Sequence, residues 1–99
     1  MSAPGGSELE RLRSEIDAVD RSIVDALVER VRIARRIGDL KEAAGQPVLD
    51  PSREAAVVRR AAERAREVGV DDEAVRELFW RFVVLSRRTQ RDERGAERG

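Results

Sequence analysis

Apolar residues in the first half of the chain recur at alternating spacings of three and four, which is the period of an amphipathic helix. The apolar stripe runs from Leu9 to Leu40, and Arg30 takes one of its positions. Gly45 and Pro47 follow the stripe, and glycine followed by proline is a typical end of a helix. We therefore predict one long helix that follows a disordered segment, residues 1–7.

Two shorter helices are predicted in the second half of the chain. Asp50 and Pro51 form an N-cap residue followed by proline at the first helical position. Gly69 is expected to end the Ala-rich helix that begins there. Asp71 or Asp72 would then cap a third helix.

The third predicted helix has an apolar stripe of its own, made of Val75, Leu78, Phe79, Phe82, Val83 and Leu85. No segment alternates between apolar and polar residues with the period of a strand. The predicted fold is therefore all-α, with a helical domain at residues 8–90 and a charged C-terminal tail at residues 91–99.

The length of the first helix indicates a partner. About 37 residues at about 1.5 Å each form a rod of roughly 55 Å, whereas a compact domain of this size is about 30–35 Å across. The projecting half still carries apolar residues, which a second copy of the chain would bury. We expect an intertwined homodimeric helix bundle, and a generic coiled-coil scaffold is the alternative.

The composition narrows the possible chemistry. The chain has no cysteine and no histidine, which excludes disulfides, cysteine metal sites and Ser-His or Cys-His nucleophiles. Its net charge of zero argues against a nucleic-acid-binding protein. No apolar run reaches the roughly 18–20 residues of a membrane span, and the N-terminus has no features of an export signal. We therefore expect a cytoplasmic protein that binds neither nucleic acid nor membrane.

Two cations of the first helix point in nearly the same direction. Lys41, the one lysine among 20 basic residues, follows Arg30 by 11 residues, so their directions differ by only about 20°. The two residues are about 16 Å apart along the axis, and their long side chains could converge on an anionic ligand. Arg13 is about 42 Å from Lys41 on the same helix. It would therefore serve the site of an antiparallel second copy.

A second group of polar residues lies on the later helices. Asp50, Arg53 and Glu54 place two carboxylates and a guanidinium near a helix N-terminus, whose dipole favours anions. Ser86 and Gln90 continue the apolar stripe of the third helix, and they need hydrogen-bond partners if they are buried. With the cations of the first helix, these residues describe a pocket that can bind, orient and polarise a polyanion without a nucleophile or a metal.

Each of these residues also has a simpler interpretation. Arg30 would be a surface arginine whose stem covers apolar residues, and Asp50 would be only an N-cap. Arg53 and Glu54 would form a solvated pair, and the serine and glutamine of the third helix would lie at its edge in water. The other arginines are assigned to solvated faces or charge pairs, among them Arg32, Arg35, Arg36, Arg59, Arg60, Arg87 and Arg88.

Four motifs in fixed order carry a resemblance to a known family. They are Leu12-Arg13-x-x-Ile16-Asp17-x-x-Asp20, Glu29-Arg30-x-x-Ile33-Ala34-x-x-Ile37-Gly38-x-x-Lys41, Pro47-x-x-Asp50-x-x-Arg53-Glu54 and Ser86-x-x-x-Gln90. In order and spacing they resemble the all-helical type of chorismate mutase over about residues 9–90. The resemblance implies an intertwined three-helix dimer, which the length of the first helix also predicts.

The resemblance also implies an activity, the conversion of chorismate to prephenate by a [3,3] rearrangement. This isomerase step leads toward phenylalanine and tyrosine and needs no cofactor and no covalent intermediate. By the family pattern, Arg30 and the second copy's Arg13 would hold the two carboxylates of the substrate. Lys41 and Gln90 would donate to the ether oxygen as its bond breaks.

The same pattern assigns four residues to substrate binding. Asp50 and Glu54 would position the ring hydroxyl of chorismate. Arg53 and Ser86 would complete the polar wall, with Ser86 at a carboxylate. No metal ligands are implied.

Three alternatives stay open at this point. Isochorismate pyruvate-lyases share the fold and the cationic pocket. A second relative rearranges 4-amino-4-deoxychorismate, whose amine would be accommodated beside Asp50 and Glu54. The third is a non-catalytic dimeric regulatory or scaffold protein. A further shikimate-pathway enzyme is also considered as a partner, which would contact the charged tail after Gln90.

Overall fold

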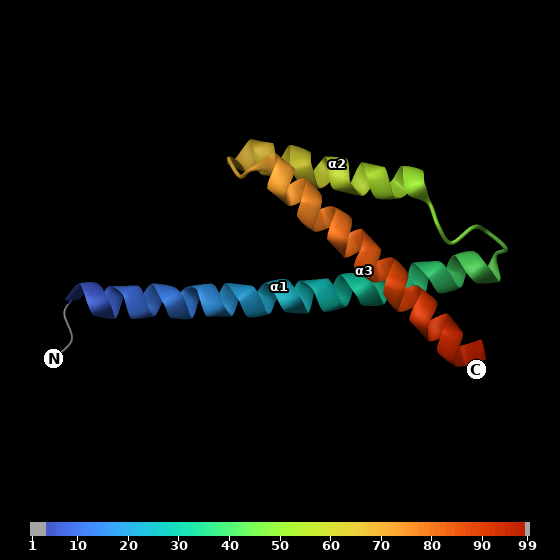
Figure 1. Ribbon diagram of the computed structural model, residues 1–99, viewed down its shortest axis with the longest axis horizontal. Coiled ribbons are helices and arrows are strands. Elements are labelled where there is room, and N and C mark those ends of the chain that lie inside the picture. The colour runs from blue at the N-terminus through green and yellow to red at the C-terminus, as the bar shows by residue number, and fades with distance from the viewer. Residues whose placement is uncertain (1–3, 99) are drawn as a thin grey trace. The chain divides into compact units, whose positions relative to one another are not determined.

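The computed structural model consists of three helices, α1 (Pro4–Ala43), α2 (Pro51–Val68) and α3 (Asp72–Arg98) (Figure 1). It describes the backbone of residues 4–98 and the side chains of residues 6–88. No strand occurs in this part of the chain. The predicted all-α class, with a long first helix and two shorter ones, is therefore confirmed.

Internal packing divides the chain into two units, residues 1–30 and residues 31–99. The first unit contains most of α1. The second contains the C-terminal part of α1 together with α2 and α3. The candidate residues are therefore distributed over both units.

The outer helices are longer than the apolar pattern predicts. α1 begins at Pro4, and α3 continues to Arg98 through the segment expected as a tail. Proline is favoured at the first helical position because it has no N–H group to leave unsatisfied. Arg and Glu dominate the last turns of α3, and both are good helix formers. The helices thus extend beyond residues 8–90 on both sides.

Glycines end α1 and α2, as predicted. Gly45 and Gly69 have φ values of 70° and 78°. This is a left-handed backbone conformation that residues with a Cβ atom rarely adopt. After α1, the N–H of Gln46 donates to the carbonyl of Lys41 at 2.8 Å, and the corresponding bond after α2 is 2.9 Å long. This pattern satisfies carbonyls that would otherwise lack a partner at the helix end.

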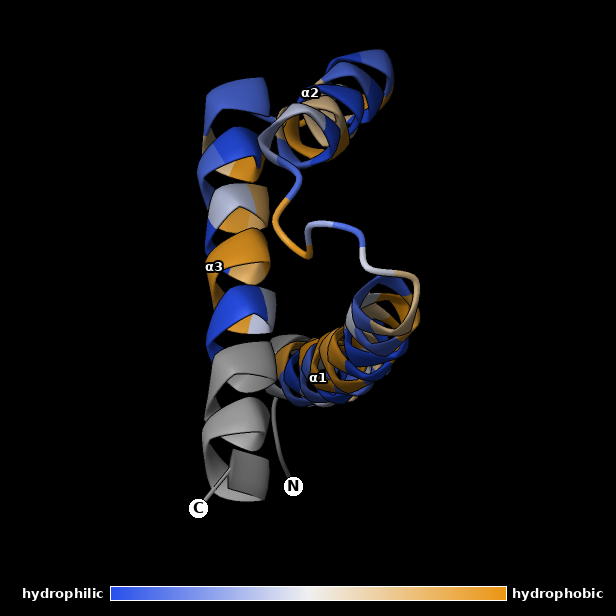
Figure 2. Cartoon of the chain, turned by 90° about the vertical axis from the view of Figure 1, so that its right-hand side faces the viewer, coloured by the Kyte–Doolittle hydropathy of each residue, from blue (hydrophilic) through white to orange (hydrophobic). Residues whose placement is uncertain are grey.

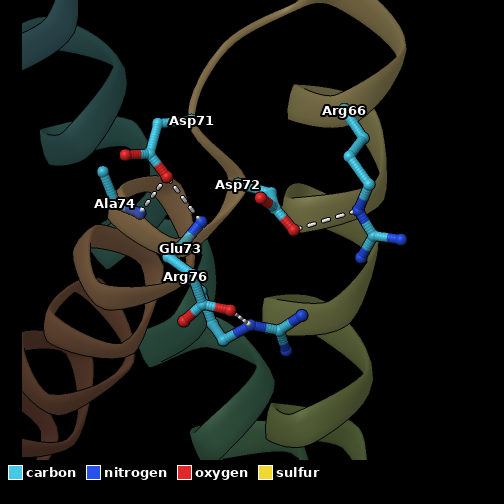
Figure 3. A network of polar contacts seen from close by, with 6 residues as sticks. All are labelled: Arg66, Asp71, Asp72, Glu73, Ala74 and Arg76. Atoms are coloured by element: carbon cyan, nitrogen blue, oxygen red, sulfur yellow. Dashed lines mark hydrogen bonds and ion pairs between the residues drawn. The ribbon is translucent and has the colours of Figure 1, made fainter.

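Asp71, and not Asp72, caps α3 (Figure 3). Its Oδ1 accepts hydrogen bonds from the N–H groups of Glu73 at 3.0 Å and Ala74 at 3.3 Å. The carboxylate of Asp72 instead accepts a hydrogen bond from Arg66 Nε at 3.0 Å. This second bond connects the end of α2 to the start of α3.

α2 and α3 pack against each other. Their buried apolar side chains are Val58, Ala62, Ala65 and Val83. Two of the three residues contributed by α2 are alanines, which allow the helix backbones to approach closely. On α3, the rings of Phe79 and Phe82 meet edge to face with centroids 5.1 Å apart, an arrangement that aromatic pairs favour. The core of the 31–99 unit therefore lies between α2 and α3.

Hydrophobic and hydrophilic residues alternate around α1 (Figure 2), and the large apolar side chains of its stripe are exposed. In the 1–30 unit its exposed members are Leu9, Leu12, Ile16, Val19, Ile23, Val24 and Val28. In the 31–99 unit Ile33, Ile37 and Leu40 are exposed in the same way. An extended exposed apolar surface is a candidate interaction site. We refer to these ten residues as the α1 stripe.

Candidate functional site

Lys41 and Asp50 are brought together by the connection between α1 and α2. Lys41 lies in the last turn of α1, and its side chain is 25% exposed. Its Nζ lies 3.9 Å from Oδ2 of Asp50. This is an ion-pair distance that exceeds the range of a hydrogen bond. Lys41 and Asp50 therefore form an ion pair without a direct hydrogen bond between Nζ and Oδ2.

Asp50 has two functions in the structure. Its Oδ1 accepts a hydrogen bond from the backbone N–H of Arg53 at 3.0 Å, so Asp50 is the predicted N-cap of α2. Its Oδ2 is the atom nearest to Lys41. One carboxylate therefore both starts a helix and pairs with the candidate catalytic lysine.

Glu54 in the first turn of α2 pairs with Arg87 of α3. Arg87 Nε donates to Oε2 of Glu54 at 2.7 Å, and Arg87 Nη2 donates to Oε1. The pair bridges residues 33 positions apart in the sequence, and only 16% of the Glu54 side chain is exposed. A bidentate arrangement of this kind fixes the carboxylate in one orientation.

Arg87 is held in place from a second direction. Its guanidinium carbon lies 5.8 Å from the centroid of the Trp80 ring, within the range of a cation–π contact. The hydrogen bond to Glu54 raises the pKa of Arg87, so the guanidinium stays charged. The sequence interpretation placed Arg87 among the arginines of solvated faces or charge pairs. It did not connect Arg87 with the candidate site, although Arg87 directly follows Ser86.

Ser86 is the one buried polar residue identified among the described side chains, with 7% of its surface exposed. Its hydroxyl donates to the carbonyl of Phe82 at 3.1 Å, one turn earlier in α3. The interpretation of Ser86 as a residue at a helix edge in water is therefore wrong. The neighbouring Val83 is buried as well, so this face of α3 points into the core.

The remaining candidates differ in their placement. Arg53 has an exposed side chain. Arg13 is exposed and Arg30 is partly buried, and both belong to the 1–30 unit. Gln90 lies in α3, and its side chain is outside the described residues.

The structure thus connects six residues of the 31–99 unit, which we call the polar cluster: Lys41, Asp50, Arg53, Glu54, Ser86 and Arg87. Lys41 pairs with Asp50, which also accepts from the Arg53 N–H. Glu54 pairs with Arg87, which Ser86 precedes in α3, and the backbone N–H of Glu54 donates to the Asp50 carbonyl. The cluster has cations, carboxylates and a hydroxyl, which are groups that bind and orient a polar anionic ligand.

Other features of the described residues lie apart from the polar cluster. A hollow of about 600 Å³ is lined by Glu77, Trp80, Arg81, Val84, Leu85 and Arg88, which are all residues of α3 outside the cluster.

Among the described residues no helix has the length and apolar character needed to cross a membrane. The same residues contain no group of three acidic side chains arranged as metal ligands.

A family model and a solved structure both indicate the same family. A family model described as chorismate mutase type II matches residues 12–91. The solved structure of chorismate mutase (form I) from Thermus thermophilus superposes with a TM-score of 0.74 and 33% identity. The superposition covers 80% of this chain and 98% of that one.

The relatives differ in how much of their length this chain covers. The 4-amino-4-deoxychorismate mutase of Streptomyces venezuelae is 36% identical over 74% of this chain and 71% of its own length. The chorismate mutase of Methanocaldococcus jannaschii is 26% identical over 85% of each chain. The T-protein of Enterobacter agglomerans is 29% identical over 87% of this chain. This chain spans only 23% of that T-protein.

Proposed function

The chain belongs to the chorismate mutase type II family, and from this premise we propose that it converts chorismate to prephenate. The observation that carries the proposal is the similarity to the Thermus thermophilus chorismate mutase, 98% of which this chain covers. The reaction is an intramolecular isomerisation of a dicarboxylate. It suits a site that binds and polarises its substrate and contains neither cysteine nor histidine.

We propose that rate acceleration comes from binding the transition state more tightly than the substrate. Arg30 and the second copy's Arg13 hold the two carboxylates and select a compact conformer. Lys41 and Gln90 donate hydrogen bonds to the ether oxygen, where negative charge develops as its bond breaks. The 3.9 Å separation of Lys41 Nζ from Asp50 supports this role, because the ammonium keeps its donors for the substrate.

Four other residues of the polar cluster, Asp50, Arg53, Glu54 and Ser86, bind and orient the substrate in this proposal. Asp50 and Glu54 position the ring hydroxyl. Arg53 and Ser86 complete the polar wall. The bidentate pair formed by Glu54 supports an orienting role, since it fixes the carboxylate.

An intertwined homodimer is part of the proposal. The exposed α1 stripe supports it, because ten large apolar side chains on one helix are the kind of surface that a second copy buries. Arg13 would then enter the partner's site. We also propose a cytoplasmic location and, as a further partner, another shikimate-pathway enzyme that contacts the segment after Gln90.

A second candidate substrate is 4-amino-4-deoxychorismate. Two mutases named for it, from Streptomyces venezuelae and Streptomyces pristinaespiralis, are 36% and 37% identical to this chain. Their identity exceeds the 26% of the Methanocaldococcus jannaschii chorismate mutase. A direct comparison of the two substrates is therefore the first experiment.

The experiment measures turnover of chorismate, 4-amino-4-deoxychorismate and isochorismate by the purified protein. We expect prephenate formation from chorismate. Exclusive turnover of another substrate would replace the proposed activity, and no turnover of any of the three would favour the non-catalytic alternative.

The shared site is tested by mixing two inactive variants, Arg13→Ala and Lys41→Ala. After subunit exchange, heterodimers contain one site in which both residues are present, so we expect activity to return. Mixing two preparations of Lys41→Ala is the control and should restore nothing. Failure of the first mixture to recover, with exchange verified, would contradict a site built from two chains.

A further inference from the structure

The pair formed by Arg87 and Glu54 bears on the choice between the two candidate substrates. Arg87 occupies both carboxylate oxygens of Glu54, and the contact is half-buried. In the proposed function, Glu54 faces the position where the two substrates differ, a hydroxyl in one and an amine in the other. The inference therefore rests on the proposed function.

The charges of the polar cluster cancel in pairs. Lys41 lies opposite Asp50, and Arg87 lies opposite Glu54. The side chain of Arg53 adds a further positive charge. Neither carboxylate is therefore left uncompensated to attract a cationic group of a ligand.

This charge balance affects the binding of the two substrates differently. A hydroxyl is neutral and can donate a hydrogen bond to a carboxylate that already accepts from arginine, since each oxygen has two acceptor positions. A primary amine is protonated near neutral pH, and it would be placed close to the guanidinium of Arg87. Juxtaposition of like charges is a strong element of discrimination between partners.

We propose that Arg87 is a specificity-determining residue, which selects the neutral ring hydroxyl of chorismate over the ammonium of 4-amino-4-deoxychorismate by neutralising and orienting Glu54. Arg87 acts through Glu54 and is a positioning residue. The contact of its guanidinium with Trp80 at 5.8 Å keeps it in place when the site is empty.

The test is the ratio of kcat/KM for chorismate to kcat/KM for the amino substrate. We expect the unmodified protein to favour chorismate by at least about tenfold. In Arg87→Gln, Glu54 keeps its charge but loses its cation, so the ratio should fall by about tenfold or more. If Arg87 had only a structural role, Arg87→Gln would lower kcat/KM for both substrates together and leave their ratio unchanged.

Three variants provide the controls. Arg88→Gln removes the same charge from the adjacent exposed residue and should leave the ratio unchanged. Arg87→Lys keeps the charge but not the bidentate geometry, and it should keep the ratio within about threefold of the original. The double variant Arg87→Gln/Glu54→Gln removes both charges. It should cancel the increase in kcat/KM for the amino substrate that Arg87→Gln alone produces relative to chorismate.

The outcomes separate this inference from the proposed function. If the unmodified protein converts neither substrate, the proposed function fails. If it converts chorismate and Arg87→Gln leaves the ratio unchanged, the function stands and the role of Arg87 is refuted. A preference of the unmodified protein for the amino substrate would also refute it, independently of whether any variant folds.

Discussion

The 1–30 unit and the 31–99 unit differ in whether any of their described apolar side chains are buried. In the first, seven apolar residues of the α1 stripe are exposed. In the second, Val58, Ala62, Ala65 and Val83 are buried between α2 and α3. The α2–α3 pair therefore has a core within one chain, whereas the apolar residues of the N-terminal part of α1 stay exposed there.

This difference in apolar burial bears on how a chain of 99 residues can form an enzyme site. A small domain buries a smaller fraction of its surface than a large one and is correspondingly marginal in stability. In the proposed function, the 31–99 unit contributes the polar cluster, and the 1–30 unit contributes Arg13, Arg30 and most of the α1 stripe. Assembly and catalysis should consequently respond to different substitutions.

The largest effect is expected from a charge in the α1 stripe. Ile16 is 61% exposed in the single chain, and Ile16→Glu would bury an unpaired carboxylate in the dimer, at a cost of about 3–5 kcal/mol. We expect dissociation to monomers at micromolar concentration, measured by sedimentation, together with loss of mutase activity. Ser14→Glu adds the same charge on the opposite face of α1 and should stay dimeric. An unaffected dimer in Ile16→Glu would show that the stripe is not the interface.

The second effect concerns the polar cluster. Lys41→Ala should lower kcat/KM for chorismate by about 10²–10³, or about 3–4 kcal/mol, because it removes a donor to the developing charge. Lys41→Arg should be nearly as damaging, since a planar guanidinium does not replace a compact ammonium at one oxygen atom. Arg64→Ala, which removes only a surface ion pair with Glu67, is the control. Near-normal activity in Lys41→Arg would contradict the role of Lys41.

The third effect concerns the core of the 31–99 unit. Ala62 is fully buried, and Ala62→Leu would add three carbon atoms to a packed interface. We expect the free energy of unfolding to fall by about 1–3 kcal/mol, measured by urea denaturation. Ala55, seven residues earlier in the same helix, is exposed, so Ala55→Leu should change the free energy of unfolding far less. Equal effects of the two substitutions would place the core elsewhere.

The smallest effect is expected at the start of α3. Asp71→Ala removes the oxygen that accepts from the N–H groups of Glu73 and Ala74, which should cost about 1 kcal/mol. Calorimetry should show a lower Tm by about 4–8 °C, with kcat/KM unchanged. Asp71→Asn retains an acceptor and should recover most of the loss. A loss of activity without a loss of stability would be inconsistent with a capping role.

Local signals in the sequence were sufficient for most of the fold. Asp50, Pro51 and Gly69 act through hydrogen bonds and backbone angles of adjacent residues, so the bounds of α2 follow from neighbouring positions. The start of α1 at Pro4 did not follow, because the first residues of that helix carry no apolar period. The choice between Asp71 and Asp72 also required the structure, since Arg66 engages one of them.

The candidate site was predictable only in part. The spacing of Arg30, Lys41 and Asp50 is local to one helix and its connection, and resemblance to a family supplied their roles. The pair of Glu54 and Arg87 depends on how α2 packs against α3 across 33 residues, and no short-range pattern contains that information. The roles of the site residues stay predictions until the variants are measured.

Because Asp50 both caps α2 and pairs with Lys41, opening of the first turn of α2 also affects the ion pair. Helix ends open and close far more often than helix centres, as amide hydrogen exchange detects. When the first turn of α2 frays, Oδ1 of Asp50 loses the Arg53 N–H, and Oδ2 is no longer held opposite Lys41. If Asp50 and Lys41 bind substrate as proposed, the fraction of molecules ready to bind it is the fraction in which this turn is closed, and the observed affinity decreases in proportion. Substrate should therefore slow exchange at the Arg53 amide more than at amides in the middle of α2.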